Sequence, residues 1–251
     1  MITKLHRIFA AFLGLSFSLG GAYFFASGLP ADSRARLITV HDRGSIQDVF
    51  VDGGAPKVFL SEIETERHLY ALGPLSKLRG ELMILDSVPW EARVRGGKVQ
   101  VKSDWKESAA FLVWASVAKW QKTRVPLSVV NLSAFESWLL SLSGKPGSPL
   151  QFQYPFLLKG RFARVSWHIV NVRDDGTPLT EEKHRAQTYH GESKDVNAEF
   201  LGFYSPEHQG IFINQGRRTH IHMKVGDELI AHVDSFDLDD RHGLILYVPS
   251  H

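Results

Sequence analysis

The arrangement of hydrophobic and polar positions divides the chain into three stretches. An apolar run from Ile8 to Ala26 carries no charged residue. Residues 33–148 then mix short apolar segments with turns and one helical pattern. From residue 149 onward, short β-type runs bounded by Gly, Asn and Asp dominate, apart from a polar stretch over 174–197 that is expected to be a long loop. These patterns predict an α+β fold.

The stretch 33–148 is expected to form a mixed β-sheet with a helix. Glu91–Lys102 alternates around a Gly-Gly pair, which is typical of a β-hairpin. Ala109–Trp120 is largely apolar, and its periodicity fits a helix or a buried strand equally well. A helix is predicted over 133–143, where Ser-Ala-Phe-Glu forms a capping box before an apolar face.

A Pro- and Gly-rich segment, Lys145–Pro149, is the best linker in the chain and marks the predicted boundary between 33–148 and 149–251. The second half is expected to be mainly antiparallel and β-barrel-like. Its predicted strands are Phe156–Lys159, Arg164–Val172, Glu199–Tyr204, Gly210–Asn214, Thr219–Lys224, Glu228–Phe236 and Gly243–Val248.

Residues 1–28 have the pattern of a signal peptide. Basic residues precede the apolar run, and Ala26-Ser27-Gly28 places small residues around a cleavage site after Gly28. The run is also about long enough to span a bilayer, so an uncleaved anchor is the main alternative and a buried core helix the other. We therefore expect a periplasmic or secreted protein, in contact with a membrane only if the segment is retained.

Composition narrows the chemistry. The 251 residues include 29 Lys and Arg against 27 Asp and Glu, a net charge of +2 that argues against nucleic acid as a partner. There is no cysteine, which excludes disulfides, thiolate nucleophiles and Cys-based zinc sites. The 12 histidines make a His-based metal site worth seeking.

Three histidines meet this expectation. His220 and His222 are two residues apart on a predicted strand, so they share a face. If the following turn is centred near Asp227, His222 faces His232 across the hairpin, and three imidazoles converge. Such a set suits Zn²⁺, and nickel, copper and iron also fit. A turn shifted by half a residue would instead pair His222 with Ala231 and turn His232 away.

Glu81 opens a strongly apolar segment, Leu82–Leu85. A carboxylate there is either paired in a salt bridge at the strand edge or functional. If it faces a metal, burial would raise its pKa and the cation would lower it, which suits proton transfer near neutral pH.

Seven short motifs follow one another over roughly residues 65–238: Leu72–Leu75, Leu78–Leu82, Lys159–Phe162, Gly202–Pro206, Gln209–Ile211, His220–His222 and Ala231–Phe236. In content and order they resemble motifs of the α-acetolactate decarboxylases. The resemblance implies that His220, His222 and His232 bind zinc, that Glu81 is the active-site glutamate, and that the protein is a homodimer converting 2-acetolactate to acetoin and CO₂.

The chain also departs from this family. Where the family carries an arginine, the matching position holds His168, with Arg161 and Arg164 nearby as other candidates to bind the substrate carboxylate. A C-terminal extension with another glutamate has no counterpart before His251. These differences keep two alternatives open: an exported enzyme of the same scaffold acting on another hydroxy-keto acid, and a non-catalytic periplasmic protein that binds a metal or ligand.

Overall fold

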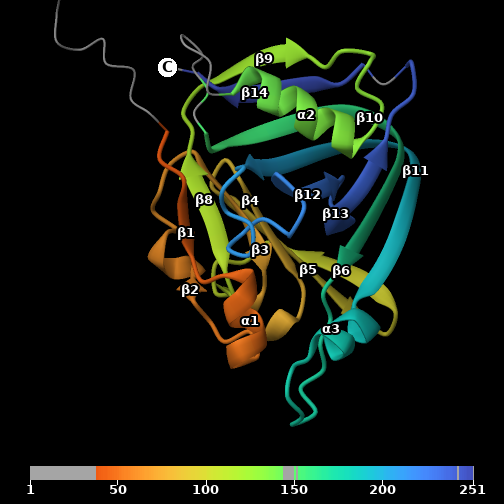
Figure 1. The fold of residues 1–251 in the computed structure, drawn as a ribbon. Helices are drawn as coiled ribbons and strands as arrows, with labels where there is room; N and C mark the ends of the chain where they lie inside the picture. Colours follow the sequence, from red (N-terminus) through yellow and green to blue (C-terminus); the bar gives the residue numbers. More distant parts are fainter. Residues whose placement is uncertain (1–37, 144–149, 151, 242, 251) are drawn as a thin grey trace, which may run out of the picture. The chain divides into compact units, whose positions relative to one another are not determined.

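The structure is a computed structural model that describes residues 38–143, 150, 152–241 and 243–250. Two β-sheets dominate it (Figure 1). The first sheet has the order β1-β8-β3-β4-β5-β6, and all its pairings are antiparallel. The predicted mixed sheet is therefore wrong, because no two neighbouring strands of this sheet run parallel. The strands are β1 (His41–Arg43), β3 (Leu69–Pro74), β4 (Glu81–Leu85), β5 (Val88–Arg95), β6 (Lys98–Lys102) and β8 (Leu112–Ser116).

The predicted hairpin is confirmed as β5 and β6, with Gly96 and Gly97 at positive φ in its turn. The ambiguous segment Ala109–Trp120 contains strands and no helix: β8 pairs with both β1 and β3. A separate two-stranded sheet joins β2 (Val58–Phe59) to β7 (Ser108–Ala109).

The second sheet has the order β11-β12-β13-β10-β14-β9, and β10 also pairs with β11. The ladder of β10, β11, β12 and β13 thus returns to its first strand, while β14 and β9 extend from β10. The antiparallel pairing predicted for this half is confirmed, but the sheet is not clearly the β-barrel-like structure that the sequence predicts. Its strands are β9 (Trp120–Arg124), β10 (Tyr154–Ile169), β11 (Tyr189–Tyr204), β12 (Thr219–Val225), β13 (Leu229–Asp237) and β14 (Ile245–Pro249).

The loop predicted over 174–197 is wrong in its second part. It contains helix α3 (Glu181–Gln187) and the first half of β11, which pairs with β10 residue by residue. Residues 189–197 bury no side chain fully, so this half-strand lacks the apolar alternation that reveals strands in a sequence.

Helix α2 (Leu132–Leu142) is confirmed, but its cap is not the predicted one. Asn131 caps the helix by accepting from Ala134 N at 2.9 Å, and Ser133 lies inside it. Phe135 packs edge-on against Phe156 and Phe236, which fixes α2 to the second sheet. Helix α2 and β9 both precede residue 148 yet belong with the second sheet (Figure 1).

Glu136 of α2 is buried and joins the helix to β12. Its Oε1 accepts from Arg218 N at 2.9 Å, Thr219 N at 2.9 Å and Thr219 Oγ1 at 2.7 Å. These bonds hold the start of the strand that carries His220 and His222.

We expect Glu136→Ala to lower the free energy of unfolding by about 2–4 kcal/mol, because three buried donors lose their acceptor. Glu136→Gln keeps an acceptor oxygen and should lose less than half of that amount. Urea unfolding of the three proteins checks this prediction. Equal stability of Glu136→Ala and the parent would contradict it.

The predicted signal or anchor segment 1–28 and the linker Lys145–Pro149 lie outside the described residues. Within the described part, no helix is long and apolar enough to cross a bilayer. All the described residues belong to one compact unit. Along the sequence, β8 is the last strand of the first sheet and β9 is the first strand of the second.

Candidate metal centre and active site

The hairpin of β12 and β13 brings three histidines together. His222 pairs directly with His232, which is the register predicted for a turn centred at Asp227. The ring centroids of His220 and His222 lie 5.0 Å apart, those of His220 and His232 5.0 Å, and those of His222 and His232 5.6 Å. All three side chains are buried.

Hydrogen bonding fixes the tautomer of His222. Its Nδ1 lies 2.9 Å from the carbonyl oxygen of Leu82, which can only accept, so Nδ1 carries the proton. The unprotonated Nε2 lies 3.2 Å from Nε2 of His220, so in the metal-free protein it accepts from His220 Nε2–H. The bond to the Leu82 carbonyl of β4 therefore orients one imidazole with its unprotonated nitrogen toward a second imidazole, as backbone carbonyls do for histidines that bind metals.

The three imidazoles are held neutral. Burial and the neighbouring histidines lower the pKa of His220 and that of His222 well below the usual value. Burial and nearby His168 lower the pKa of His232 to about 4. In addition, Nδ1 of His220 and Nδ1 of His232 are buried without a hydrogen bond. A divalent metal of borderline softness binds neutral imidazoles that lie close together and have nitrogens without hydrogen-bond partners. These three histidines meet that description.

Glu81 reaches the same cluster from β4. Its Oε1 accepts from Val170 N at 3.0 Å, and its Oε2 lies 3.6 Å from His222 Nε2. Burial raises the pKa of Glu81 to about 7, although the positive charge of His168 and the Val170 bond act in the opposite direction. The carboxyl group therefore exchanges its proton near neutral pH, and the Val170 bond leaves Oε2 as the oxygen that carries it.

This pKa predicts a pH-dependent stability in the metal-free protein. The unfolded chain loses the Glu81 proton near the ordinary glutamate pKa of 4.5 and the folded chain near 7, so the folded state binds more protons between these values. The contribution of the protonated Glu81 carboxyl group to the free energy of unfolding is complete below pH 4.5 and is lost as pH rises through 7. Glu81→Gln has no such titration. We expect the unfolding free energy of Glu81→Gln relative to the parent to rise by roughly 3 kcal/mol between pH 4.5 and 8. Urea titrations at both pH values test this, and parallel profiles would contradict it.

His168 of β10 stands at the centre of a row of histidines. It pairs with His190 of β11 on one side and with His232 of β13 on the other. Its Nδ1 donates to Asp234 at 2.6 Å, and its ring centroid lies 4.4 Å from that of His232. Burial lowers the pKa of His168, but the Asp234 bond and the charges of Glu81 and Asp234 outweigh it, so the pKa is raised.

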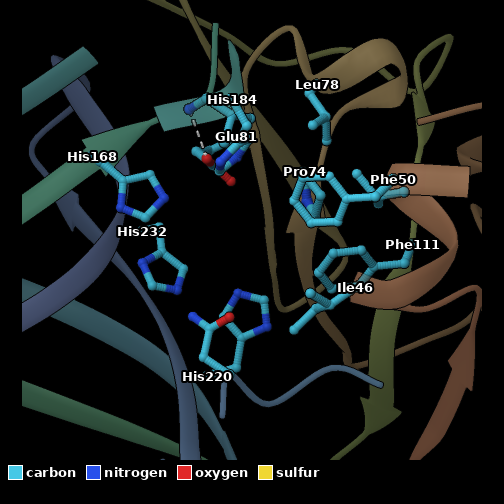
Figure 2. Close-up of a pocket in the computed structure, with 13 residues that line it drawn as sticks. Ile46, Phe50, Pro74, Leu78, Glu81, Phe111, His168, His184, His220 and His232 are labelled. Carbon is cyan, nitrogen blue, oxygen red and sulfur yellow. Dashed lines mark hydrogen bonds between the residues drawn. The ribbon is translucent and has the colours of Figure 1, made fainter. Parts of the chain in front are cut away.

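A cavity of about 200 Å³ lies beside these groups. Figure 2 shows the imidazoles of His168, His220 and His232 along one wall and apolar side chains along the other, with Glu81 between them. A space of this size suits a molecule of a few carbon atoms. The apolar wall comprises Ile46, Val49, Phe50, Pro74, Leu78 and Phe111.

Helix α1 (Ile46–Asp52) covers part of this cavity. Ser45 caps the helix by accepting from Asp48 N, and Ile46 N donates to Ile211 O at 2.8 Å. These bonds place Ile46 and Phe50 over the site. The β-type residues of Gln47–Val51 favour a short strand in the sequence, and that prediction is wrong because the segment is helical.

The two predicted substrate-binding arginines do not reach the cavity. Arg161 is bound to Asp195 and to Asp239, the latter at 2.9 Å. Arg164 is bound to Asp237 at 2.8 Å, with a side chain 54% exposed. No Lys or Arg among the described residues lines the cavity, so His168 is the cavity residue best placed to carry positive charge.

Three residues near the site were not foreseen. Asp234 follows His232 by two positions, but its role depends on a bulge that no sequence pattern reveals. His190 and His184 lie in the stretch that was expected to be a loop. His184 lines the cavity from α3 and contacts Phe50 edge-on, with ring centroids 5.8 Å apart.

Comparisons with known proteins agree with this geometry. The crystal structure of alpha-acetolactate decarboxylase from Bacillus subtilis strain 168 has a TM-score of 0.66 at 16% identity, covering 84% of this chain and 86% of that one. A Staphylococcus aureus protein of unknown function similar to alpha-acetolactate decarboxylase gives 0.65 at 14% identity, covering 84% and 85%. A search of curated sequences gave no match.

These identities are low, so the likeness to solved structures shows the fold alone. A family model provides the stronger statement. The model of alpha-acetolactate decarboxylase matches residues 69–243, which include Glu81, His168 and all three histidines of the hairpin. The chain therefore belongs to the alpha-acetolactate decarboxylase family.

Proposed function

We infer that this chain is a metal-dependent decarboxylase that converts 2-acetolactate to acetoin and CO₂. The observation that carries the proposal is the meeting of three neutral imidazoles with a buried carboxyl group of raised pKa, beside one small cavity that His220, His232 and Glu81 line. Membership of the family supports the reaction class.

The imidazoles of His220, His222 and His232 would hold the metal, with Zn²⁺ as the first choice and other divalent transition metals as alternatives. When bound there, a divalent ion supplies a Lewis acid that polarises oxygens of the substrate. The bond from His222 Nδ1 to Leu82 O orients this ligand and keeps its Nε2 unprotonated.

Glu81 supplies the proton. The carbon–carbon bond to the substrate carboxylate breaks, CO₂ leaves, and the electron pair stays on the carbon and its neighbouring carbonyl. The proton on Oε2 of Glu81 then passes to that carbon and completes acetoin, and solvent restores the proton afterwards. Oε1 stays bound to Val170 N, so the carboxyl group keeps its orientation through the transfer.

His168 binds the substrate carboxylate. Its Nδ1 is committed to Asp234, so its Nε2–H is the donor left for the cavity (Figure 2). The apolar wall holds the methyl groups and excludes water, which strengthens these polar contacts.

A second substrate is favoured by one observation: a histidine takes the place of a guanidinium at the cavity, and both nearby arginines are bound elsewhere. A single imidazolium binds a carboxylate less rigidly than a bidentate arginine. The same scaffold would then act on another 2-hydroxy-3-keto acid.

Kinetic assays with a panel of 2-hydroxy-3-keto acids distinguish these two substrate proposals. Acetolactate should give the highest kcat/KM if the first proposal holds. A higher value for a larger homologue would favour the second. Metal binding without turnover of any member would instead favour a non-catalytic binding protein.

Export is part of this proposal, because the N-terminal 28 residues have the pattern of a signal peptide. The protein would work in the periplasm or outside the cell, held at a membrane only if that segment is retained. By family likeness it would form a homodimer. Size-exclusion chromatography with light scattering of the purified chain tests the dimer, and fractionation of expressing cells tests the location.

A further inference from the structure

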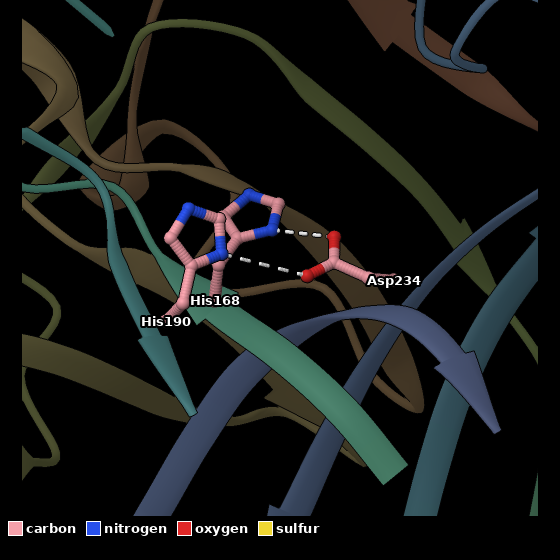
Figure 3. Close-up of side chains that lie close together, drawn as sticks. All are labelled: His168, His190 and Asp234. Atoms are coloured by element: carbon pink, nitrogen blue, oxygen red, sulfur yellow. Dashed lines mark hydrogen bonds and ion pairs between the residues drawn. The ribbon is translucent and has the colours of Figure 1, made fainter. Parts of the chain in front are cut away.

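A β-bulge aims one carboxylate at the row of histidines. Ser235 pairs with Ser166 and Val233 pairs with Trp167, so Asp234 is the extra residue between two paired positions. Bulges redirect side chains and are enriched beside active sites. Here the bulge turns Asp234 toward His168 and His190, as Figure 3 shows.

The three side chains form a compact donor set. His168 and His190 are direct partners on adjacent strands, with ring centroids 5.7 Å apart. Asp234 lies between them: Oδ1 is 2.6 Å from Nδ1 of His168, and Oδ2 is 3.9 Å from Nδ1 of His190. One ligand atom from each residue lies within 4.8 Å of the others.

These separations are close to those of a metal site. Ligands about 2.0–2.1 Å from a tetrahedral zinc ion lie roughly 3.3 Å from one another. The two contacts of Asp234, at 2.6 and 3.9 Å, bracket this separation, so shifts of about an ångström would suffice. Two imidazoles and one carboxylate are a common donor set for divalent zinc, iron, cobalt and nickel.

The set also borders open space. A pocket of about 340 Å³ outside the cavity is lined by His168, His190 and Asp234, together with His184 and Phe50. The His190 side chain is 61% exposed. A bound ion would therefore keep room for water or an added ligand, as catalytic and exchangeable sites require.

We propose that His168, His190 and Asp234 bind a second divalent transition-metal ion, separate from the ion of the three-histidine site. The ion binds through Nδ1 of His168 and leaves its Nε2–H on the side of the cavity. None of these three residues is a ligand of the three-histidine site, although Asp234 Oδ1 lies 3.5 Å from Nδ1 of His232. Binding of the second ion therefore does not rest on the proposed reaction.

The two sites should differ in affinity. The rings of His168 and His232 lie 4.4 Å apart between centroids, so two cations in these sites repel each other. The three-histidine site is the more buried of the two and fills first. The second site is more exposed, and we expect it to bind at least tenfold more weakly.

Calorimetric titration of the chelator-treated full chain with Zn²⁺, repeated with Co²⁺ absorption, tests the proposal. The parent should bind two ions per chain. His190→Ala and Asp234→Asn should each bind one, with the tighter event retained, whereas His222→Ala should lose the tighter event. His68→Ala is the matched control, because His68 and Asp86 form an exposed pair at 3.0 Å away from this cluster.

One ion in the parent would overturn the proposal. Two ions in both His190→Ala and Asp234→Asn would also overturn it, because the second ion would then bind elsewhere. His190 is exposed, so its replacement should leave the fold intact, and circular dichroism of each variant verifies this.

Discussion

Replacement of His222 by alanine should abolish binding at the three-histidine site and lower kcat/KM by about 10³-fold or more. Removal of one hydrogen-bond donor from an oxyanion hole typically lowers kcat by 10²–10³-fold. Loss of the metal should lower the rate by more, because the entire Lewis acid is removed. Metal analysis of the purified variant and the initial rate of acetoin formation measure the two effects.

A second replacement separates metal loss from misfolding. His222 is completely buried and donates to Leu82 O, so alanine leaves that carbonyl unpaired. His222→Gln can still donate an amide N–H there but lacks the imidazole. It should fold like the parent and still lack the tightly bound metal. Full metal content and activity in both variants would exclude His222 as a ligand.

Glu81→Gln should retain the metal and lower kcat by about 10²–10⁴-fold, the usual contribution of a positioned acid or base. The glutamine keeps an oxygen for Val170 N but has no proton to donate at neutral pH. In the parent, kcat should fall as pH rises through the pKa of Glu81, since the protonated form is the donor. A bound cation moves that fall to lower pH.

Glu91→Gln is the matched control for this prediction. Glu91 is a second buried glutamate of the same sheet, on the neighbouring strand opposite Leu82, and its carboxylate is paired with Arg93. We expect its kcat to stay within about threefold of the parent, because surface and structural pairs act on stability rather than on turnover. Equal losses of kcat in both variants would show that Glu81 has no chemical role.

The candidate metal hairpin could be predicted because its signals are local. Gly226 and Asp227 fix the turn, the turn fixes the register, and the register places His222 opposite His232. The hairpin of β5 and β6 could also be predicted from its turn glycines, and helix α2 from its apolar face. The wrong cap of α2 has a simple reason: Glu136 is committed to Arg218 and Thr219, which are distant in sequence.

Other parts depend on long-range contacts. The first half of β11 is a strand because β10 pairs with it, although its side chains are mostly polar and exposed. Asp234 joins His168 through a bulge, and no periodicity indicates an extra residue. The ion pairs of Arg161 and Arg164 are also invisible in the sequence, because Asp195, Asp237 and Asp239 are distant along the chain.

The most direct measurement of the central claim is acetoin release from racemic acetolactate by the purified full chain, before chelation, after chelation and after return of Zn²⁺. We predict release by the protein as purified, loss on chelation and recovery with one equivalent of Zn²⁺. Activity that persists unchanged in the chelated, metal-free chain would contradict the metal-dependent mechanism. Absence of acetoin from a chain carrying its full metal content would contradict the reaction itself.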